Sequence, residues 1–436
     1  MYLKQLSLAL AIVQAAGMAN AAQEYWKSFS SNVDPLNITI PSIPQTTSYN
    51  ENTECTWYDP SSFFKYDPKE WPTSWDVATS NGINKSAEFT ALYNSIDWKS
   101  APNIPVRKAV NGALDMTGYD SSKDPDCWWS ASMCTKPKHP NINEDIYECP
   151  EPETWGLTYD DGPNCSHNAF YDYLEQQKLK ATMFYIGSNV LNWPYGAQRG
   201  IKDGHHIAQH TWSHGLMTTL TNEEVLAELY YTQKIIKAIT GVTPRYWRPA
   251  FGDVDDRVRW IATQLNLTTI LWNLDTDDWA AGVSEPMSTI QKNYEDFIQM
   301  GTNGTFKNSG NIVLSHEINN TTMQLAVDYI PKIKKAYKNV VDVATCMNIT
   351  YPYMEKTISF KGFGGNSSTS NASSSSSSSA KASGTAAGSS SSSSSSPSGQ
   401  AVADNATANT QSGAAAHAPA IVFATAAAGL AAHLLL

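Results

Sequence analysis

Two adjacent carboxylates stand in the segment TYDDGP at residues 158–163, directly after an apolar stretch. Like charges in one cleft raise each other's pKa, so Asp160 and Asp161 would be costly to bury together. A metal ion bound by one of them would remove that cost and leave the other free to act as a base. An Asp-Asp pair before Gly-Pro is also common turn chemistry, so this segment alone does not distinguish a turn from a site.

A second segment, HTWSH at residues 210–214, contains two imidazoles four residues apart. At this spacing His210 and His214 can face one metal ion. With a carboxylate they would form a three-ligand site with open positions for water and substrate. The same spacing is also found on ordinary helix surfaces. The neighbouring His205 and His206 do not fit the spacing, and we interpret them as structural or lining residues.

Three further segments carry groups that could complete such a site. RPAFGD begins with Arg248, whose guanidinium can hold a carboxylate in place. DTDDW at residues 275–279 follows an apolar strand, and IVLSH is a strand that delivers His316 at its carboxyl end. Functional groups of α/β barrels gather at the carboxyl ends of strands. Four of the five segments stand at the ends of predicted strands.

The elements that must position these groups alternate short apolar strands with amphipathic helices. A capping box between Thr221 and Glu224 predicts the start of a helix with apolar residues at helical spacing. Strands are predicted at residues 154–159, 181–186, 268–272 and 311–315. This alternation predicts a parallel α/β sheet or barrel.

The five segments, in this order, resemble the five motifs of carbohydrate esterase family 4, the polysaccharide deacetylases. That family includes fungal chitin deacetylases and bacterial peptidoglycan and xylan deacetylases. The resemblance spans residues 158–316 and implies a distorted (β/α) barrel. It also implies one divalent metal ion. Nitrogen and oxygen ligands favour zinc, with Co²⁺ and Mn²⁺ as alternatives.

The resemblance implies a role for each position that matches a family motif. The reacting groups are the catalytic base Asp160, the metal ligands Asp161, His210 and His214, and the catalytic acid His316. The supporting groups are Arg248 beside the base, the peptide N–H of Phe251 at the oxyanion, and Leu314 and Trp279 around the acetyl group, with Asp278 or else Asp275 tuning the acid. We prefer Asp278 because it is adjacent to the tryptophan. Four positions depart from the family pattern: Tyr159, Trp212, Ala250 and Phe251. None of these departures removes a metal ligand, the acid or the base, so they bear on how the substrate fits.

The implied reaction is hydrolysis of an N-acetyl amide in chitin or chitin oligomers, which releases acetate. Acetylated xylan is the alternative substrate. A glycoside hydrolase needs two carboxyls about 5–10 Å apart across the sugar, which the adjacent Asp160 and Asp161 do not suit. A non-catalytic wall mannoprotein would need none of the five segments.

Both ends of the chain resemble targeting signals. Residues 1–21 have the basic start, apolar core and small-residue end of a secretory signal peptide. The tail 418–436 follows small residues, as in a glycosylphosphatidylinositol (GPI) attachment signal, with Ser412 or Asn405 as the attachment residue. A tail anchor and an alanine-rich low-complexity end without function are the alternatives. We expect a protein anchored at the outer plasma membrane or cell wall, where wall glucan could be a partner. The expected parts are a signal peptide 1–21, a loop-rich extension 22–148, a catalytic domain 149–350, a disordered, glycosylated Ser-rich stalk 351–412 and a propeptide 413–436.

Composition agrees with an extracellular protein. The net charge of −11 and the pI near 5.3 exclude the basic footprint of a nucleic-acid binder. Six cysteines in an oxidising compartment predict up to three disulfides. Cys149 and Cys346 flank the catalytic zone and are expected to pair, and the other pairings stay open. N-glycosylation sequons stand at Asn37, Asn84, Asn164, Asn266, Asn303, Asn319, Asn320, Asn348, Asn366, Asn371 and Asn405.

Overall fold

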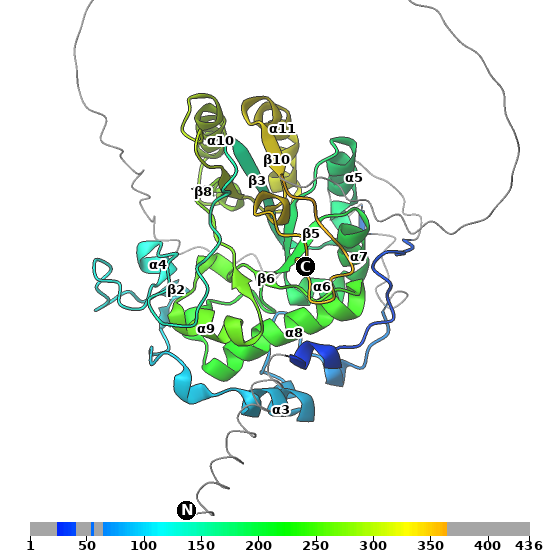
Figure 1. Ribbon diagram of the computed structural model, residues 1–436, viewed down its shortest axis with the longest axis vertical. Helices are drawn as coiled ribbons and strands as arrows, with labels where there is room; N and C mark the ends of the chain where they lie inside the picture. The colour runs from blue at the N-terminus through cyan, green and yellow to red at the C-terminus, as the bar shows by residue number, and fades with distance from the viewer. Residues whose placement is uncertain (1–23, 41–53, 56–63, 364–436) are drawn as a thin grey trace, which may run out of the picture. The chain divides into compact units, whose positions relative to one another are not determined.

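The computed structural model describes residues 24–40, 54–55 and 64–363 (Figure 1). The expected signal peptide, the serine tract with its sequons and the anchor signal with Ser412 lie outside the described residues. The expected end of the catalytic domain at residue 350 is too early. Tyr353 is fully buried, and its hydroxyl accepts the peptide N–H of Ile207 at 2.9 Å. The packed part of the chain therefore continues into the segment expected to be stalk.

A sheet with only parallel pairings forms the centre of the described part, in the order β7-β6-β5-β4-β3-β9-β8, with β10 also paired to β3. Its strands are β3 (Thr154–Gly162), β4 (Thr182–Tyr185), β5 (His206–Gln209), β6 (Tyr246–Trp247), β7 (Thr268–Thr269), β8 (Leu274–Asp275), β9 (Asn311–Leu314) and β10 (Asn339–Val341). The distorted (β/α) barrel is confirmed, and it is open between β7 and β8, which end the hydrogen-bonded path among the described residues.

One predicted strand is shorter than expected. The sequence predicts a strand over residues 268–272, whereas β7 ends at Thr269. Beyond that point Leu271 donates its N–H to the carbonyl of Ile146 at 2.7 Å, and Ile146 and Ile270 form an isolated parallel bridge. A segment of the extension therefore pairs with the chain just beyond β7, a contact that local sequence cannot indicate.

Helices cover the sheet, and α10 lies beside α11 (Figure 1), where Tyr294 and Tyr329 stack at 4.5 Å. The barrel helices are α5 (Asn168–Gln176), α6 (Gly187–Asn192), α7 (Pro194–Lys202), α8 (Asn222–Thr240), α9 (Asp256–Gln264), α10 (Met287–Thr302), α11 (Asn320–Ala336) and α12 (Val343–Cys346). The predicted capping box is confirmed: Thr221 Oγ1 accepts the N–H of Glu224, and the Glu224 carboxylate accepts the N–H of Thr221. Apolar residues at helical spacing bury α8 against the barrel.

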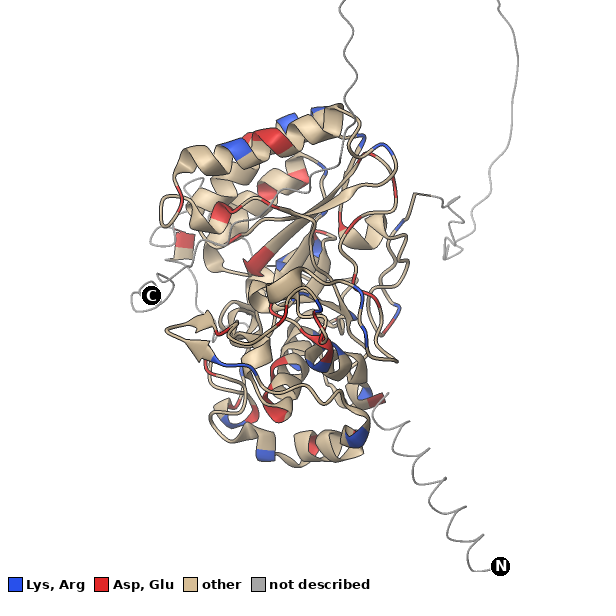
Figure 2. Cartoon of the chain, turned by 90° about the vertical axis from the view of Figure 1, so that its left-hand side faces the viewer, with Lys and Arg blue, Asp and Glu red and all other residues tan. Residues whose placement is uncertain are grey.

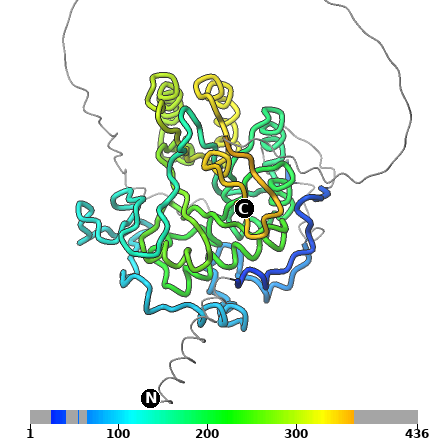
Figure 3. Tube along the Cα trace, in the orientation of Figure 1, coloured from blue at the N-terminus to red at the C-terminus, as the bar shows by residue number. Residues whose placement is uncertain are grey.

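The described part of the N-terminal extension packs along α8 and α9 (Figure 3). It contains the helices α3 (Ala87–Ser95) and α4 (Trp129–Ser132) and the antiparallel strands β1 (Ala109–Val110) and β2 (Ala113–Leu114). Trp71, Phe89 and Trp128 are buried. Phe89 stacks on Tyr231 of α8 at 5.8 Å. The aromatic clusters of this zone therefore serve mainly to join it to the barrel.

Three disulfides link the described cysteines. Cys149 pairs with Cys346, as predicted. The pairings that the sequence left open are Cys55–Cys165 and Cys127–Cys134. The first of these two ties the extension to the turn after β3, close to Asp160 and Asp161 in sequence.

The described sequons differ in accessibility. The glycan would be attached to the side-chain nitrogen of the asparagine. In Asn84 this nitrogen donates to Glu223 Oε1 at 2.8 Å, and the residue is only 8% exposed. Asn84 is therefore the least accessible of the described sequons, and its glycosylation stays a prediction. The exposed sequons are Asn37, Asn303, Asn319, Asn320 and Asn348, and the half-buried ones are Asn164 and Asn266.

Figure 2 shows acidic and basic residues interspersed along the helices of the described part. Within the described residues, no helix combines the length and apolar character required to cross a membrane.

Candidate metal centre and active site

The site is built at the carboxyl ends of neighbouring strands. Asp160 and Asp161 end β3, and His316 follows β9, which pairs parallel with β3. Asp160 and His316 form a parallel bridge, and Asp160 donates its N–H to the carbonyl of Ser315 at 3.0 Å. Two segments far apart in sequence thus deliver both residues to one edge of the sheet.

Three predicted ligands converge at this edge. The Oδ1 atom of Asp161 lies 3.4 Å from His210 Nε2 and 3.2 Å from His214 Nε2. Burial opposes ionisation of Asp161, but the nearby imidazoles, His214 first, hold the pKa of this carboxyl well below its usual range. Burial lowers the pKa of His210 to about 4, so its ring is neutral at physiological pH.

These residues fit a divalent cation. Asp161 Oδ1 is buried and lacks a hydrogen-bond partner, and the three ligand atoms lie within 4.8 Å of one another. The other ring nitrogen of His210, Nδ1, lies 2.7 Å from the carbonyl oxygen of Arg248. A metal-ligating histidine typically donates its second N–H to such a partner, which fixes the orientation of the ring.

The two histidines lie in a loop, so the ordinary helix surface left open by the sequence is excluded. His210 directly follows β5, and its N–H donates to the carbonyl of Tyr185 on β4 at 2.8 Å. Thr211 and His214 both adopt left-handed backbone angles, with φ values of 66° and 55°. The reversal of the chain between them returns His214 to the same edge of the sheet.

The guanidinium of Arg248 fixes the carboxylate of Asp160. One guanidinium nitrogen donates to Asp160 Oδ1 at 2.7 Å and to Thr158 Oγ1 at 2.9 Å. A second donates to the carbonyl of Leu271 at 3.2 Å, and the guanidinium lies 4.1 Å from the ring centre of Phe184. Both Arg248 and Asp160 are buried. The carboxylate is therefore fixed in one orientation beside the three converging ligands.

His316 is paired with Asp278, the aspartate preferred from the sequence. Nδ1 of His316 lies 2.6 Å from Asp278 Oδ1, and the His316 N–H donates to Asp278 Oδ2 at 2.9 Å. Burial alone would lower the pKa of His316, but the Asp278 carboxylate outweighs it and raises the pKa to about 10. The alternative, Asp275, accepts the N–H of Asp277 at 2.9 Å and stabilises the turn.

The remaining predicted positions are two exposed aromatic residues and one buried leucine. Phe251 is 61% exposed, has a left-handed φ of 58°, and its ring lies 4.6 Å from that of His214. Trp279 is 43% exposed, whereas Leu314 is buried at the end of β9. An exposed aromatic rim beside buried charged groups is suited to stacking on a sugar ring.

The arrangement of the two aspartates disfavours a glycoside hydrolase. The carboxylates of Asp160 and Asp161 lie 3.6 Å and 3.4 Å from the same atom, Nε2 of His210. They belong to one cluster, whereas glycosidases place two carboxyls on opposite sides of a sugar.

His205 and His206 are structural, as interpreted from the sequence. Both are buried, and burial lowers the pKa of each to about 3. His205 Nδ1 accepts the N–H of Ala181, and His206 packs 5.7 Å from the ring of Phe360.

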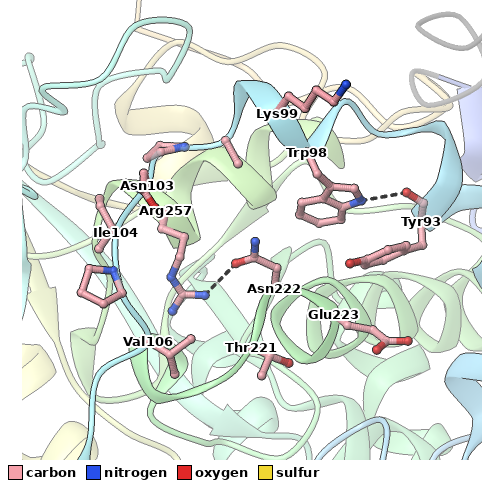
Figure 4. Close-up of a pocket in the computed structure, with 13 residues that line it drawn as sticks. Tyr93, Trp98, Lys99, Asn103, Ile104, Val106, Thr221, Asn222, Glu223 and Arg257 are labelled. Atoms are coloured by element: carbon pink, nitrogen blue, oxygen red, sulfur yellow. Dashed lines mark hydrogen bonds between the residues drawn. The ribbon is translucent and has the colours of Figure 1, made fainter.

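A separate pocket lies between the extension and the start of α8 (Figure 4). Tyr93, Trp98 and Arg257 line it together with Asn222, and none of the predicted site residues does. Trp98 donates its indole N–H to the carbonyl of Tyr93, and Arg257 donates to Asn222 Oδ1. These two donors of the pocket are thus engaged by the protein, whereas Arg257 Nε is buried without a hydrogen-bond partner among the described residues.

Sequence reasoning missed Glu228, a buried carboxylate on α8 that accepts the N–H groups of Trp212 and Ser213 at 2.9 and 2.8 Å. The available signal was a single acidic residue among the apolar positions of a helix. A charge at such a position needs buried donors.

Comparison with known proteins agrees with this geometry. The family model described as polysaccharide deacetylase matches residues 147–270. The chain is 64% identical over 359 residues to the chitin deacetylase of Amylomyces rouxii, covering 81% of this chain and 85% of that protein. It is 47% identical over 322 residues to chitin deacetylase 2 of Cryptococcus neoformans var. grubii, covering 72% and 69%. A solved chitin deacetylase from Colletotrichum lindemuthianum is 26% identical, with a TM-score of 0.45, covering 49% of this chain and 96% of that one. The chain belongs to the polysaccharide deacetylases.

Proposed function

We propose that this protein removes N-acetyl groups from chitin by hydrolysis, giving chitosan and acetate. The observation that carries the proposal is the convergence of Asp161, His210 and His214 beside Asp160 and His316 at one edge of the sheet. The choice of chitin is supported by the 64% identity to a chitin deacetylase.

Asp161, His210 and His214 would hold one divalent ion in the proposed enzyme. Their one oxygen and two nitrogen ligands suit Zn²⁺, with Co²⁺ and Mn²⁺ as alternatives. When bound, such an ion supplies Lewis-acid activation of water and of the acetyl carbonyl. The neutral state of His210 leaves its nitrogen lone pair available for that role.

Asp160 and His316 would divide the proton transfers of the reaction. Asp160, held by Arg248, takes one proton from water as the oxygen attacks the acetyl carbon, and the peptide N–H of Phe251 donates to the developing oxyanion. His316 gives its proton to the amide nitrogen as the C–N bond breaks. Acetate and a glucosamine unit leave. The pairing with Asp278 keeps His316 protonated for this step.

The substrate would lie against the aromatic rim. Trp279 and Phe251 are the exposed aromatics beside the reacting groups, and apolar ring faces of this kind bind the faces of sugars. Leu314 would bound the pocket for the acetyl methyl group. The O-acetyl ester of acetylated xylan is the competing substrate.

We also propose a secreted enzyme that is GPI-anchored at the outer plasma membrane or cell wall, where wall glucan could be a partner. The three disulfides suit an oxidising compartment, and the exposed sequons suit a glycoprotein. The terminal segments that would direct this location are known only from the sequence.

Acetate release by the purified protein tests the function. We expect acetate from chitin oligomers, loss of release with a chelator, and recovery when Zn²⁺, Co²⁺ or Mn²⁺ is added. Acetate from acetylated xylan alone would reassign the substrate. Shortened sugar chains without acetate would indicate a glycoside hydrolase, and neither product would indicate a non-catalytic wall protein.

A further inference from the structure

The loop between the two histidines needs support from outside itself. Thr211 and His214 both have left-handed backbone angles, which cost about 1 kcal/mol or more per residue when the side chain is not glycine. One internal hydrogen bond, from the His214 N–H to Thr211 Oγ1 at 3.1 Å, closes the turn. His210 is anchored at the end of β5, so the position of His214 depends on what holds the intervening residues.

The carboxylate of Glu228 holds those residues. Its Oε2 accepts the N–H groups of Trp212 at 2.9 Å and Ser213 at 2.8 Å. Its Oε1 accepts the hydroxyl of Ser213 at 2.9 Å and the N–H of Ala78 at 2.9 Å. Glu228 is fully buried, and these four donors fill the acceptor capacity of a carboxylate. Three of the four belong to the loop.

The fourth donor, Ala78, belongs to the N-terminal extension, which contacts the same loop at two more points. The indole N–H of Trp212 donates to the carbonyl of Thr73 at 3.0 Å. The ring of Trp71 stacks on that of Trp212, with 6.5 Å between centres and 8° between planes. The bulky Trp212, which departs from the family pattern in the sequence, thus has its partner outside the barrel.

The other side of the loop is held by the start of α6. Gly187 donates its N–H to the carbonyl of Thr211 at 2.8 Å, and Ser188 donates its hydroxyl to the carbonyl of Trp212 at 2.7 Å. A Cβ atom at Gly187 would lie 2.6 Å from the Trp212 ring, so helix and loop are in direct contact. The same hydroxyl of Ser188 accepts the N–H of Trp75 in the extension at 2.8 Å. The extension therefore reaches both sides of the loop.

We propose that Glu228 and the extension residues Trp71, Thr73 and Ala78 form a clamp that sets the metal affinity of the site by fixing His214. This proposal rests on the proposed metal-binding role of Asp161, His210 and His214. The clamp gives the N-terminal extension, which lies outside the catalytic motifs, a role in metal binding. The clamp residues are positioning residues, because they act on the ligands through the loop.

Metal affinity is the direct readout. In Glu228→Gln, the side-chain NH₂ group must face an N–H donor on at least one side, so a buried donor loses its partner. Trp71→Leu removes the stacked ring without altering the barrel. Removal of groups that orient metal ligands typically weakens metal binding about 10–100-fold, and we expect a weakening of at least about tenfold in both variants by calorimetric titration of the apoprotein with Zn²⁺.

Glu88→Gln is the matched control. Glu88 is also an extension residue that contacts α8, through an ion pair with Lys234 at 2.6 Å. The Lys234 ammonium lies 5.5 Å from the ring centre of Trp71, but the structure records no contact of Glu88 or Lys234 with the histidine loop. We expect Glu88→Gln to keep the wild-type Zn²⁺ affinity, even if the melting temperature of the apoprotein falls as much as in the clamp variants.

The outcomes separate the two proposals. Absence of Zn²⁺ binding to the wild-type protein would refute the proposed metal site. Wild-type affinity in a clamp variant that keeps the native near-UV circular dichroism would refute the clamp, and so would an equal loss of affinity in Glu88→Gln. If Glu228→Gln does not fold, Trp71→Leu decides. Loss of the fold in both would also refute the clamp, because the contacts would then serve general stability.

Discussion

Replacement of Asp278 by asparagine should move the alkaline limit of activity without removing the site. The carboxylate of Asp278 contacts His316 twice, through Oδ1 at 2.6 Å from the ring Nδ1 and through Oδ2 at 2.9 Å from the peptide nitrogen. Asparagine has nearly the same shape and keeps one oxygen acceptor. It removes the negative charge that stabilises the protonated imidazole.

The size of the effect follows from that charge. The pKa of His316 is raised to about 10 although burial opposes protonation, so the acid form persists well above neutral pH in the wild type. A hydrogen bond to a charged group contributes about 1.5–3 kcal/mol. Because one pKa unit corresponds to about 1.36 kcal/mol, the substitution should lower the pKa of His316 by about 1–2. Deprotonation removes the catalytic acid, so the alkaline limb should move to lower pH by the same amount.

The assay is the pH profile of kcat/KM for acetate release from chitin oligomers, which reports ionisations of the free enzyme. Asp275→Asn is the control, because Asp275 lies in the same segment but accepts the N–H of Asp277. Its alkaline limb should move less than that of Asp278→Asn, because the structure records no hydrogen bond between Asp275 and His316 and the two interact only through space. An alkaline limb of Asp278→Asn at the wild-type position, with activity retained, would refute the assignment of His316 as the acid tuned by Asp278.

Three further predictions test the site, the fold and the location. Asp161→Ala should abolish Zn²⁺ binding, whereas Asp160→Asn should bind Zn²⁺ and lose turnover; equal metal loss in both variants would overturn the division of roles. Replacement of Cys149 and Cys346 by alanine should lower the free energy of unfolding by about 5 kcal/mol on the chain-entropy estimate for a loop of this length, measured by denaturant titration, and an unchanged midpoint would contradict it. Phosphatidylinositol-specific phospholipase should release active enzyme from cells, with glucanase needed for any wall-linked fraction. Detection of the peptide 421–436 in the mature surface protein would refute the GPI anchor.

Local sequence was sufficient to predict those structural features that depend only on residues close together in the chain. The capping box of α8 needs only Thr221 and Glu224, and the apolar periodicity that follows them predicts the buried face. The strands at β3, β4 and β9 were predicted within a few residues for the same reason. The order of the five segments identified the family before any contact was known.

Contacts between distant segments decided the rest. Asp275 and Asp278 are the same residue type and lie three positions apart, so the sequence does not distinguish them. The register of β8 and β9 determines which of them contacts His316. Asn84 carries a normal sequon, but α8 buries it. The pairing of Cys55 with Cys165 joins residues 110 positions apart, a proximity that no spacing rule encodes.

The sequence by itself therefore determined which side chains are the candidates for the chemistry, because a reaction type requires particular residue types in particular short motifs. The tertiary structure alone decided how they are held. The Glu228 carboxylate belongs to α8 and contacts the loop directly although it lies 15 residues after Ser213 in the chain. Ala78 donates to it from a part of the chain outside the catalytic motifs. These supporting contacts join residues that are distant in sequence. Local sequence patterns do not encode such contacts, so only the folded structure shows them.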